Sequence, residues 1–213
     1  MAAEPIEPVA IAVLAKAPIA GFAKTRLTPV LGAEGAALLQ ERLIERAVAT
    51  ACAAATGPVT IWAGPDEGHT AFAALRARFS VALARQSDGD LGARMLAATV
   101  KASGAGLVIG TDCPVLTADH LRSAAGVLRR GADAVVFPAE DGGYVLIGTR
   151  RPLPLLFSDM RWGTAEVMTE TRHRLTMHGL GWQEPYTLWD VDVPADLARM
   201  RSIGLHDIIP PAT

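Results

Sequence analysis

The chain has 213 residues, of which 50% are hydrophobic, and it carries a formal net charge of −2. This near-neutral balance gives no general basic field, which disfavours nucleic acid as a partner and means that any anion must be bound by a local cluster. The length fits one α/β core. We therefore expect a single domain over residues 1–213, with its core at about 9–203.

The cysteines and the first residues bear on where the protein works. Cys52 lies in an alanine-rich helical pattern and Cys113 stands beside Asp112, a pair too sparse for a disulfide framework or a cysteine-based zinc site. Residues 1–8 are acidic and proline-containing where a signal peptide needs a cationic and then an apolar stretch. No apolar run reaches the roughly 18 residues of a membrane span. We expect a cytoplasmic protein.

Short β-branched runs alternate with longer helical patterns, which is typical of a mainly parallel sheet covered by helices. The expected strands, in chain order, are residues 9–14, 59–63, 81–84, 106–109, 134–138, 144–148 and 182–188. The expected helices are residues 38–51, 69–78, 91–102, 118–130, 165–178 and 194–203. The tail after Gly204 is expected to be loosely held.

The spacing of two of these strands indicates a mixed sheet. Residues 134–138 and 144–148 are separated by 139–143, which is too short for a crossover helix, so this pair should be antiparallel or nearly so. A plain six-stranded dinucleotide fold is then disfavoured. Neither a G-x-G-x-x-G motif after the first strand nor a P-loop motif is present, which argues against nicotinamide dehydrogenases and P-loop NTPases.

A cluster of cations follows the first strand. Lys16, Lys24 and Arg26 lie close together there, although the whole chain has only three lysines. Pro18 and Gly21 identify the segment as a loop, and Gly21 allows close backbone approach. Because ammonium and guanidinium groups bind phosphate oxygens, the loop predicts a phosphate site. A solvated loop with ordinary surface charges is the alternative.

Carboxylates at strand ends supply the second half of such a site. The strand at 106–109 runs into Asp112, and ligands of open α/β sheets bind beyond the carboxyl ends of strands. Asp190 and Asp192 follow the last expected strand and alternate in direction, so only one faces the pocket unless the strand has already ended. Asp112 with either of them could bind Mg²⁺ or Mn²⁺ together with substrate phosphates. Turn formation by Asp112 and helix capping by Asp192 are the alternatives.

Five motifs in a fixed order resemble a known family. They are Ala15-Lys16-Ala17-Pro18 with Gly21 and Lys24-Thr25-Arg26-Leu27, Gln86 with Gly89-Asp90-Leu91-Gly92-Ala93-Arg94-Met95, Gly110-Thr111-Asp112-Cys113-Pro114, Asp141-Gly142-Gly143-Tyr144, and Asp190-Val191-Asp192. Over roughly residues 9 to 200 they resemble bacterial glycosyltransferase-A-like proteins of unknown specificity, in the nucleotide-diphospho-sugar transferase superfamily, related to phospholactate and phosphoenolpyruvate guanylyltransferases. The resemblance implies an α/β fold, a three-layer α/β/α sandwich on a mixed, mainly parallel sheet.

The resemblance also implies roles for single residues. Nucleotide and phosphate binding would fall to Ala15, Lys16, Pro18, Gly21, Lys24, Arg26, Gln86, Gly89, Gly92 and Arg94. The acceptor or sugar would contact Asp141, Gly142, Gly143 and Tyr144. Apart from the resemblance, Trp162, just before the expected helix 165–178, could form an apolar platform for a ring on the same side. Catalysis would involve Lys24, Asp112 and Asp141, and the metal ligands would be Asp112, Asp190 and Asp192. Ordinary turns at 87–90 and 141–143 are the alternatives for the glycine-containing segments.

One departure from the family pattern concerns the metal. Glycosyltransferases of this fold carry an Asp-x-Asp motif, and here Gly110 stands in place of its first aspartate, before Asp112. Only one carboxylate is then available locally, which makes a contribution from Asp190 or Asp192 necessary.

Three functions stay open. The first is glycosyl transfer from a nucleoside-diphosphate sugar to a small acceptor, and the second is nucleotidylyl transfer from a nucleoside triphosphate to a phosphorylated or carboxylated acceptor, with release of pyrophosphate. The third is non-catalytic nucleotide binding. The lysine-rich loop favours the second because a triphosphate carries more charge. The Gly-Gly-Tyr element and the family's usual naming favour the first, which we prefer. A homodimer is left open.

Overall fold

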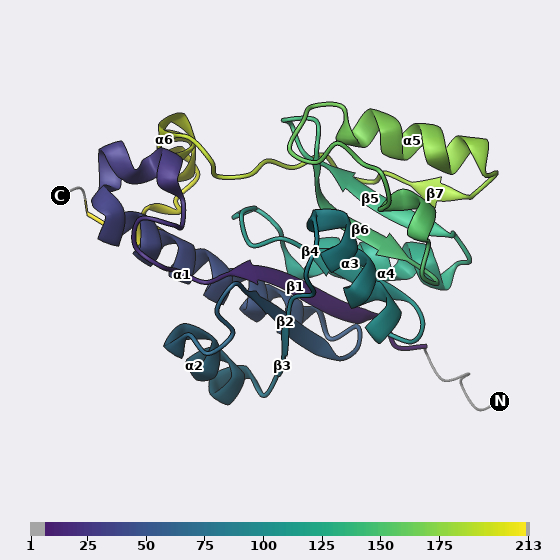
Figure 1. Ribbon diagram of the computed structural model, residues 1–213, viewed down its shortest axis with the longest axis horizontal. Coiled ribbons are helices and arrows are strands. Elements are labelled where there is room, and N and C mark those ends of the chain that lie inside the picture. The colour runs from purple at the N-terminus through teal and green to yellow at the C-terminus, as the bar shows by residue number, and fades with distance from the viewer. Residues whose placement is uncertain (1–6, 212–213) are drawn as a thin grey trace.

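The computed structural model describes residues 7–211, in which a seven-stranded sheet lies between two layers of helices (Figure 1). The strands are β1 (Ala10–Lys16), β2 (Val59–Gly64), β3 (Ala82–Arg85), β4 (Gly106–Ile109), β5 (Ala134–Pro138), β6 (Tyr144–Thr149) and β7 (Trp182–Gln183). The α-helices are α1 (Thr28–Ala54), α2 (Thr70–Phe79), α3 (Leu91–Lys101), α4 (Ala118–Arg129), α5 (Val167–Met177) and α6 (Pro194–Ser202). Within the described residues, no helix is both long enough and apolar enough to cross a membrane.

The sheet is mixed, as the sequence predicts. Its strand order is β3-β2-β1-β4-β6-β5-β7. The pairs β1–β2, β1–β4, β2–β3 and β5–β7 are parallel, whereas β6 runs antiparallel to both β4 and β5. The short connection between β5 and β6 forces this reversal, because a parallel pair needs a long crossover.

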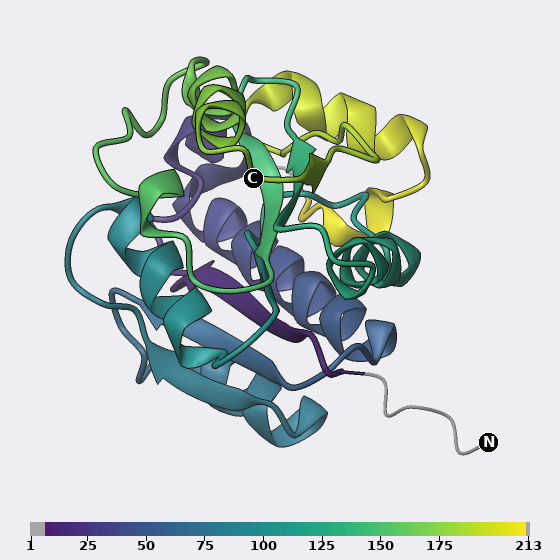
Figure 2. The same ribbon diagram turned by 90° about the vertical axis from the view of Figure 1, so that its right-hand side faces the viewer.

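Successive side chains along the strands pack into two separate hydrophobic cores, one on each face of the sheet. Ile11 and Val13 of β1 pack with α1, α2 and α4, whereas Ala12 packs on the other face with α3 and α5. This alternation is the two-residue period of a strand with helices on both faces. Figure 2 shows the two helix layers after a quarter turn. The predicted three-layer sandwich is confirmed.

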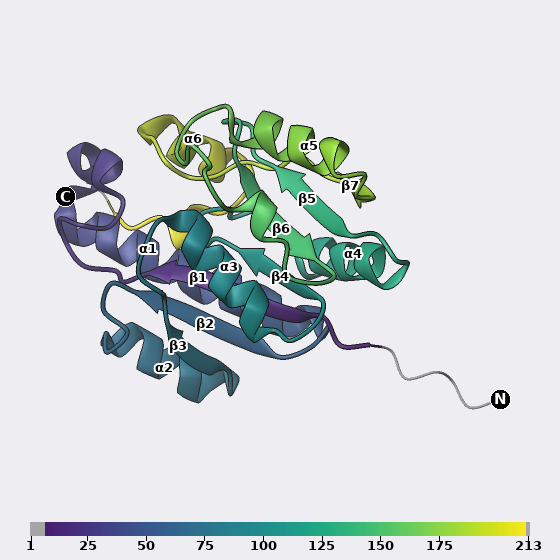
Figure 3. The same ribbon diagram turned by 45° about the vertical axis from the view of Figure 1, so that its right-hand side comes forward.

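A third core joins the end of the chain to the start of α1. Leu31 and Leu43 of α1 pack with Val191, Leu197 and Ile208, all of them buried. As a result, α6 and the segment before it lie over the first part of α1 (Figure 1, Figure 3). This packing carries the distal aspartates toward the loop after β1.

The part of the tail that the structure describes, residues 205–211, packs on the protein, so the expectation of a loose tail is wrong for these residues. Residues His206–Ile208 form a turn of 3-10 helix, and Ile208 and Ile209 are buried. The Arg42 Nη1 atom donates hydrogen bonds to the carbonyl oxygens of Asp207 (3.1 Å) and Ile208 (3.2 Å). Two adjacent isoleucines show no periodicity, so only their packing on α1 reveals their role.

The last expected strand is shorter than the predicted 182–188. Only Trp182–Gln183 forms β7, followed by one isolated bridge between Leu188 and Ala139. Pro185 offers no backbone N–H to the ladder, which explains the interruption. The segment carrying the distal aspartates is therefore not a strand, and the rule that alternate residues face opposite sides does not apply to it.

Candidate active site

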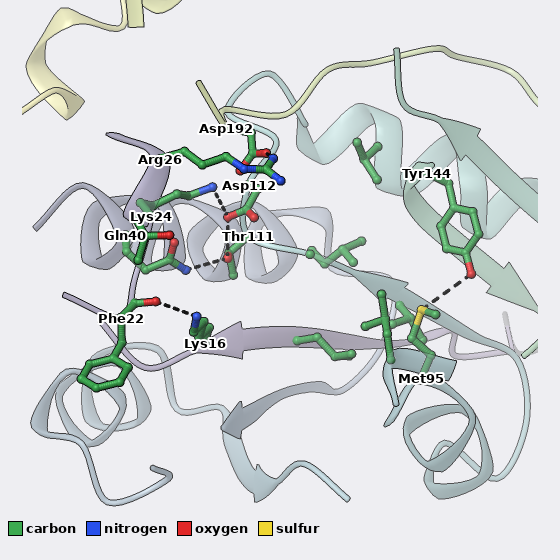
Figure 4. A pocket seen from close by; sticks show the side chains of 17 residues that line it. Lys16, Phe22, Lys24, Arg26, Gln40, Met95, Thr111, Asp112, Tyr144 and Asp192 are labelled. Carbon is green, nitrogen blue, oxygen red and sulfur yellow. Dashed lines mark hydrogen bonds and ion pairs between the residues drawn. The ribbon is translucent and has the colours of Figure 1, made fainter. Parts of the chain in front are cut away.

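A pocket of about 410 Å³ lies at the carboxyl ends of β1 and β4, within the size range of small-molecule sites. The loop after β1 contributes Lys16, Phe22, Lys24 and Arg26 to it, and the segment after β4 contributes Asp112. The segment before α6, helices α1 and α3, and strand β6 also contribute to its walls. The pocket therefore joins the two halves that the sequence predicts, the cationic loop and the strand-end carboxylates (Figure 4).

Lys24 ties these halves together. Its Nζ lies 2.8 Å from Oδ1 of Asp112 and donates a hydrogen bond of 2.6 Å to the Val191 carbonyl oxygen. The Lys24 side chain is 4% exposed, whereas that of Asp112 is 46% exposed. Lys24 has a left-handed backbone (φ 47°), which is unfavourable for a residue with a side chain. The ion pair and the carbonyl contact hold it there.

The other loop cations also have protein partners. Arg26 forms an ion pair with Asp192 in which both side chains are largely exposed. Lys16 Nζ donates a hydrogen bond of 2.6 Å to the carbonyl oxygen of Phe22. Exposed pairs contribute little free energy because water screens them. Arg26 and Lys16 can therefore exchange these partners for a phosphate more readily than the buried Lys24 can.

The remaining predicted loop residues shape the backbone. Ala15 and Pro18 are buried, and the Ala15 carbonyl oxygen accepts a hydrogen bond of 3.1 Å from Gln86 Nε2. Gly21 has φ 78°, and no atom lies within 4 Å of the position where a Cβ would stand. Glycine therefore suits this position because of its positive φ, and not because a larger side chain would clash with a neighbour.

Asp190 is a partly buried carboxylate in a negative environment. Its pKa is raised from 3.8 to about 7, first by burial and then by the charges of Asp112 and Asp141, with a smaller contribution from Asp192. Lys24 opposes this shift. The carboxylates thus repel one another, and Lys24 does not fully compensate their negative charge. Such a strongly shifted pKa is typical of a functional site.

The neighbouring cysteine is unsuited to nucleophilic chemistry. Burial, followed by the charge of Asp190, raises the pKa of the Cys113 thiol to about 12. A thiol of that pKa stays protonated at neutral pH. The candidate chemistry therefore rests on the carboxylates and the cations.

The carboxylates fit a divalent cation that arrives with a substrate. Mg²⁺ and Mn²⁺ prefer oxygen ligands, and Mg²⁺ usually takes one or two carboxylates, substrate phosphates and water. Asp112 and Asp190 repel each other, as the raised pKa of Asp190 shows, and a cation between them would relieve that repulsion. Among residues 7–211, no three His, Cys, Asp or Glu side chains come close enough to hold an ion alone.

Two residues that the sequence interpretation missed support Asp112 from behind. Gln40 of α1 is buried, and its Nε2 donates a hydrogen bond of 3.1 Å to Thr111 Oγ1. The Thr111 hydroxyl in turn donates to Asp112 Oδ1 at 3.3 Å. An amide on the apolar stripe of α1, next to Leu39, is the signal that could have revealed this contact.

A second pocket of about 410 Å³ lies beyond the ends of β2 and β3 and shares Lys16 with the first. Gln86, Gly89 and Arg94 line it. Gln86 Nε2 also donates to the Trp62 carbonyl oxygen at 2.9 Å, and Arg94 Nε donates to that of Gly89 at 3.2 Å. These three predicted residues therefore lie together, beside the cationic loop after β1.

The turn before α3 includes a helix cap. The Asp90 side chain accepts a hydrogen bond of 2.8 Å from the Ala93 backbone N–H, as expected for an N-cap. Gly89 has φ 102°, which a turn made with glycine allows. The predicted turn at 87–90 is therefore present, and it forms one wall of the second pocket.

Gly92 lies at a close contact within the protein. A Cβ there would lie 2.2 Å from the Phe157 carbonyl oxygen and 2.9 Å from the Trp162 ring. Trp162 in turn meets Tyr144 edge to face, with ring centroids 6.3 Å apart. Trp162 therefore supports the pocket through Tyr144, which lines it.

This contact gives a testable prediction. Gly92→Ala should lower the free energy of unfolding by about 1–3 kcal/mol, because the backbone oxygen of Phe157 cannot move aside cheaply. Gly104→Ala is the matched control, since nothing lies within 4 Å of its Cβ position. Urea unfolding of both variants measures the difference, and equal stabilities would contradict the packing role.

The predicted acceptor segment forms the hairpin between β5 and β6. The Gly143 N–H donates a hydrogen bond of 3.0 Å to Asp141 Oδ1, and Gly142 has φ 92°. A Cβ on Gly142 would lie 2.4 Å from the Ala165 carbonyl oxygen. The predicted turn is thus present, and the charge of Asp141 raises the pKa of Asp190, but neither residue lines the pocket.

The mixed sheet, the cationic loop after β1 and the carboxylate after β4 define the protein as one with the nucleotide-diphospho-sugar transferase fold. The chain belongs to the family described as "Uncharacterized protein conserved in bacteria (DUF2064)", whose model matches residues 47–164. None of the curated protein sequences compared with the chain matches it.

Solved structures confirm the predicted superfamily. A "putative nucleotide-diphospho-sugar transferase" from Desulfovibrio desulfuricans G20 is 29% identical, with a TM-score of 0.79 over 87% of this chain and 82% of that one. CMP:2-keto-3-deoxy-manno-octonic acid synthetase in complex with CTP is 13% identical (TM-score 0.58; 94% and 100% covered). The 4-diphosphocytidyl-2C-methyl-D-erythritol synthase from Anaerococcus prevotii DSM 20548 is 8% identical (TM-score 0.60; 92% and 98% covered). The last two share the fold alone.

Proposed function

We propose that the protein transfers a glycosyl group from a nucleoside-diphosphate sugar to the hydroxyl group of a small acceptor. One observation carries this proposal. Lys24, from the loop after β1, lies 2.8 Å from Asp112, at the end of β4, inside a pocket of substrate size. A cation and a carboxylate at neighbouring strand ends can hold the two components of a metal-bound diphosphate.

The loop cations would stabilise the leaving group. As the glycosidic bond breaks, negative charge builds up on the departing nucleoside diphosphate. Arg26 and Lys16 would leave Asp192 and the Phe22 carbonyl oxygen to bind phosphate oxygens, because both side chains are exposed. Lys24 would stay in place and set the position of Asp112.

A divalent cation bound with the donor would add Lewis-acid stabilisation of the diphosphate. Asp112 is one proposed ligand, and Asp190, whose pKa is raised by the charge of Asp112, is the other. Asp192, which also lines the pocket, would be the alternative once Arg26 has left it. The second pocket, lined by Gln86, Gly89 and Arg94, would hold the nucleoside, since it adjoins the phosphate loop at Lys16.

The transfer itself needs an acceptor and a base. The acceptor oxygen forms a bond to the anomeric carbon, the bond from that carbon to the diphosphate oxygen breaks, and its electrons leave with the diphosphate. In an inverting reaction, a carboxylate accepts the hydroxyl proton. Asp141 is the candidate base when Asp190 binds the metal, and Asp190 is the candidate only if it does not. The hairpin at Asp141–Tyr144 forms the acceptor side of the site in this proposal.

A thermal-shift panel tests the proposal. Nucleoside triphosphates, diphosphates and nucleotide sugars are each added with and without manganese. A ligand at 100 times its Kd should stabilise the protein by about 2.7 kcal/mol, which is a shift of several degrees in Tm. A nucleotide sugar that shifts Tm only with manganese supports the proposal, and no shift with any nucleotide would contradict it.

Nucleotidylyl transfer is the second candidate function. The loop brings Lys16, Lys24 and Arg26 to one pocket, and this much positive charge also suits a triphosphate. The same panel separates the two, because a triphosphate would then give the largest shift and release pyrophosphate when an acceptor is present. Nucleotide binding without turnover would instead indicate a non-catalytic protein.

Restoring the missing family carboxylate gives a further prediction. Gly110 lines the pocket, and nothing lies within 4 Å of its Cβ position, so Gly110→Asp should be accommodated. The added carboxylate next to Asp112 should lower the manganese concentration needed for nucleotide-dependent stabilisation by about tenfold. Gly110→Asn, equal in size but uncharged, is the control. An unchanged or higher manganese requirement for Gly110→Asp would remove the metal from this end of the pocket.

A further inference from the structure

The active-site pocket has a charged end and an apolar end. Its apolar half consists of Leu14 of β1, Leu91 and Met95 of α3, Val108 of β4 and Tyr144 of β6. In Figure 4, Met95 and Tyr144 lie at the end of the pocket opposite the labelled loop cations and aspartates. The two halves are continuous, so one bound molecule can reach from the phosphate end into the apolar half.

The apolar half offers few polar partners. The Tyr144 hydroxyl contacts Met95 Sδ at 3.8 Å, and a thioether is only a weak acceptor. Burial raises the pKa of the Tyr144 phenol well above its usual range, so it stays neutral. Trp162 meets the Tyr144 ring edge to face and is itself fitted against Gly92, which keeps this wall rigid.

Large apolar side chains also stand exposed at the mouth of the pocket. Phe22, in the loop after β1, is 67% exposed, and Leu91, at the start of α3, is 44% exposed. Exposed apolar groups that continue a concave apolar lining are typical of a surface that a ligand covers. Leu91 therefore extends the apolar half outward, whereas Phe22 lies in Figure 4 at the end of the loop cations, beside Lys16.

These properties discriminate between ligand classes. A sugar carries several hydroxyl groups, and each one loses hydrogen bonds to water when it enters a site that cannot replace them. A hydrocarbon ring or chain has no such requirement and gains from leaving water. One phenol hydroxyl and one thioether cannot satisfy a polyhydroxylated ring.

We infer that the apolar half holds the body of the acceptor, and that this acceptor is an alcohol or phenol built on a hydrocarbon ring or chain, rather than a sugar. This inference rests on the proposed function in one respect: it takes the acceptor, and not the nucleotide, as the occupant. The reacting hydroxyl would point toward Asp112, with the hydrocarbon part against Met95 and Val108.

Two probes with the same carbon ring test the inference. Cyclohexanol has one hydroxyl group and myo-inositol has six, so they differ in polarity but share a ring. Saturation-transfer NMR on the full chain should detect binding of cyclohexanol and little or no binding of myo-inositol. Binding of myo-inositol as strong as that of cyclohexanol would overturn the inference.

A matched pair of variants locates the binding. Leu91 and Val100 are both exposed apolar residues of α3, 44% and 56% exposed, but only Leu91 lines the pocket. Leu91→Gln should weaken cyclohexanol binding about fivefold, and Val100→Gln should leave it unchanged. Both sites face solvent, so neither variant should unfold. Equal effects of the two variants would overturn the inference.

Competition with nucleotide separates this inference from the proposed function. The nucleotide that gives the largest thermal shift with manganese should leave cyclohexanol bound. Displacement of cyclohexanol would assign the apolar half to the nucleotide and overturn the inference. If no nucleotide binds while cyclohexanol binding still depends on Leu91, the apolar site stands and the proposed function fails.

Discussion

Replacing Asp112 with asparagine is expected to abolish the stabilisation of the protein by nucleotide and manganese together, and to reduce turnover by at least about a thousandfold. Asparagine keeps the size of the side chain but removes the charge that the proposed cation needs. It also leaves Lys24, 4% exposed, without its ion partner at 2.8 Å. Thermal shifts with and without manganese, together with a transfer assay, measure both effects.

Some loss of stability without ligand should accompany Asp112→Asn. The Asp112 side chain is 46% exposed, so water screens much of the pair with Lys24, and we expect a fall of only a few degrees in Tm. Asp119→Asn is the matched control, because Asp119 is paired with Arg122 on the surface of α4, outside both pockets at the strand ends. Nucleotide-dependent stabilisation that survives in Asp112→Asn would exclude Asp112 from the metal site.

The sheet could be predicted from the sequence because its strands are short apolar runs between polar turns. The expected bounds 106–109 and 134–138 coincide with β4 and β5. The reversed strand β6 follows from the short connection before it, since no crossover fits there. Strand β7 could not be placed in the same way, because the predicted run continued past Pro185.

The chemistry of the site could be predicted, but its contacts could not. A cationic loop and carboxylates at strand ends can be recognised from short stretches of sequence. The hydrogen bond from Lys24 to Val191 joins residues 167 positions apart, and no local pattern encodes it. In the sequence, Gln40 is one polar residue among others in a helix. Only the packing of the helix shows that it bonds to Thr111.

The loop cations have protein partners that the sequence does not reveal. If the Lys24 side chain were exposed and had no partner in the protein, its replacement by alanine would not lower the free energy of unfolding. In the structure its side chain is buried and bridges Asp112 and Val191, so Lys24→Ala removes two contacts of the fold. The loop cations therefore already have protein partners, and in the proposed function Arg26 and Lys16 would exchange theirs for phosphate oxygens.

Replacing Asp190 with asparagine is expected to stabilise the protein without ligand at pH 8. The pKa of Asp190 is about 7 in the folded protein, against an ordinary value of 3.8. Between these values the folded state holds a proton that the unfolded chain has released, so the free energy of unfolding falls as the pH rises from about 4 to 7. Asparagine has no such proton. The variant should therefore exceed the wild type by up to a few kcal/mol at pH 8, and this advantage should fade toward pH 4.

Manganese and nucleotide should reverse this order. A cation beside Asp190 favours its charged form, so the wild type gains stability from the ligand, whereas Asp190→Asn gains little. Urea unfolding at pH 5 and pH 8, with and without manganese and nucleotide, measures all four states. Asp192→Asn is the comparison, because Asp192 is exposed and paired with Arg26, and its loss should change the pH dependence little. If the wild type were as stable as Asp190→Asn at pH 8 without ligand, ionisation of Asp190 would not lower the free energy of unfolding. The crowding of carboxylates could then not support the proposed metal at this site.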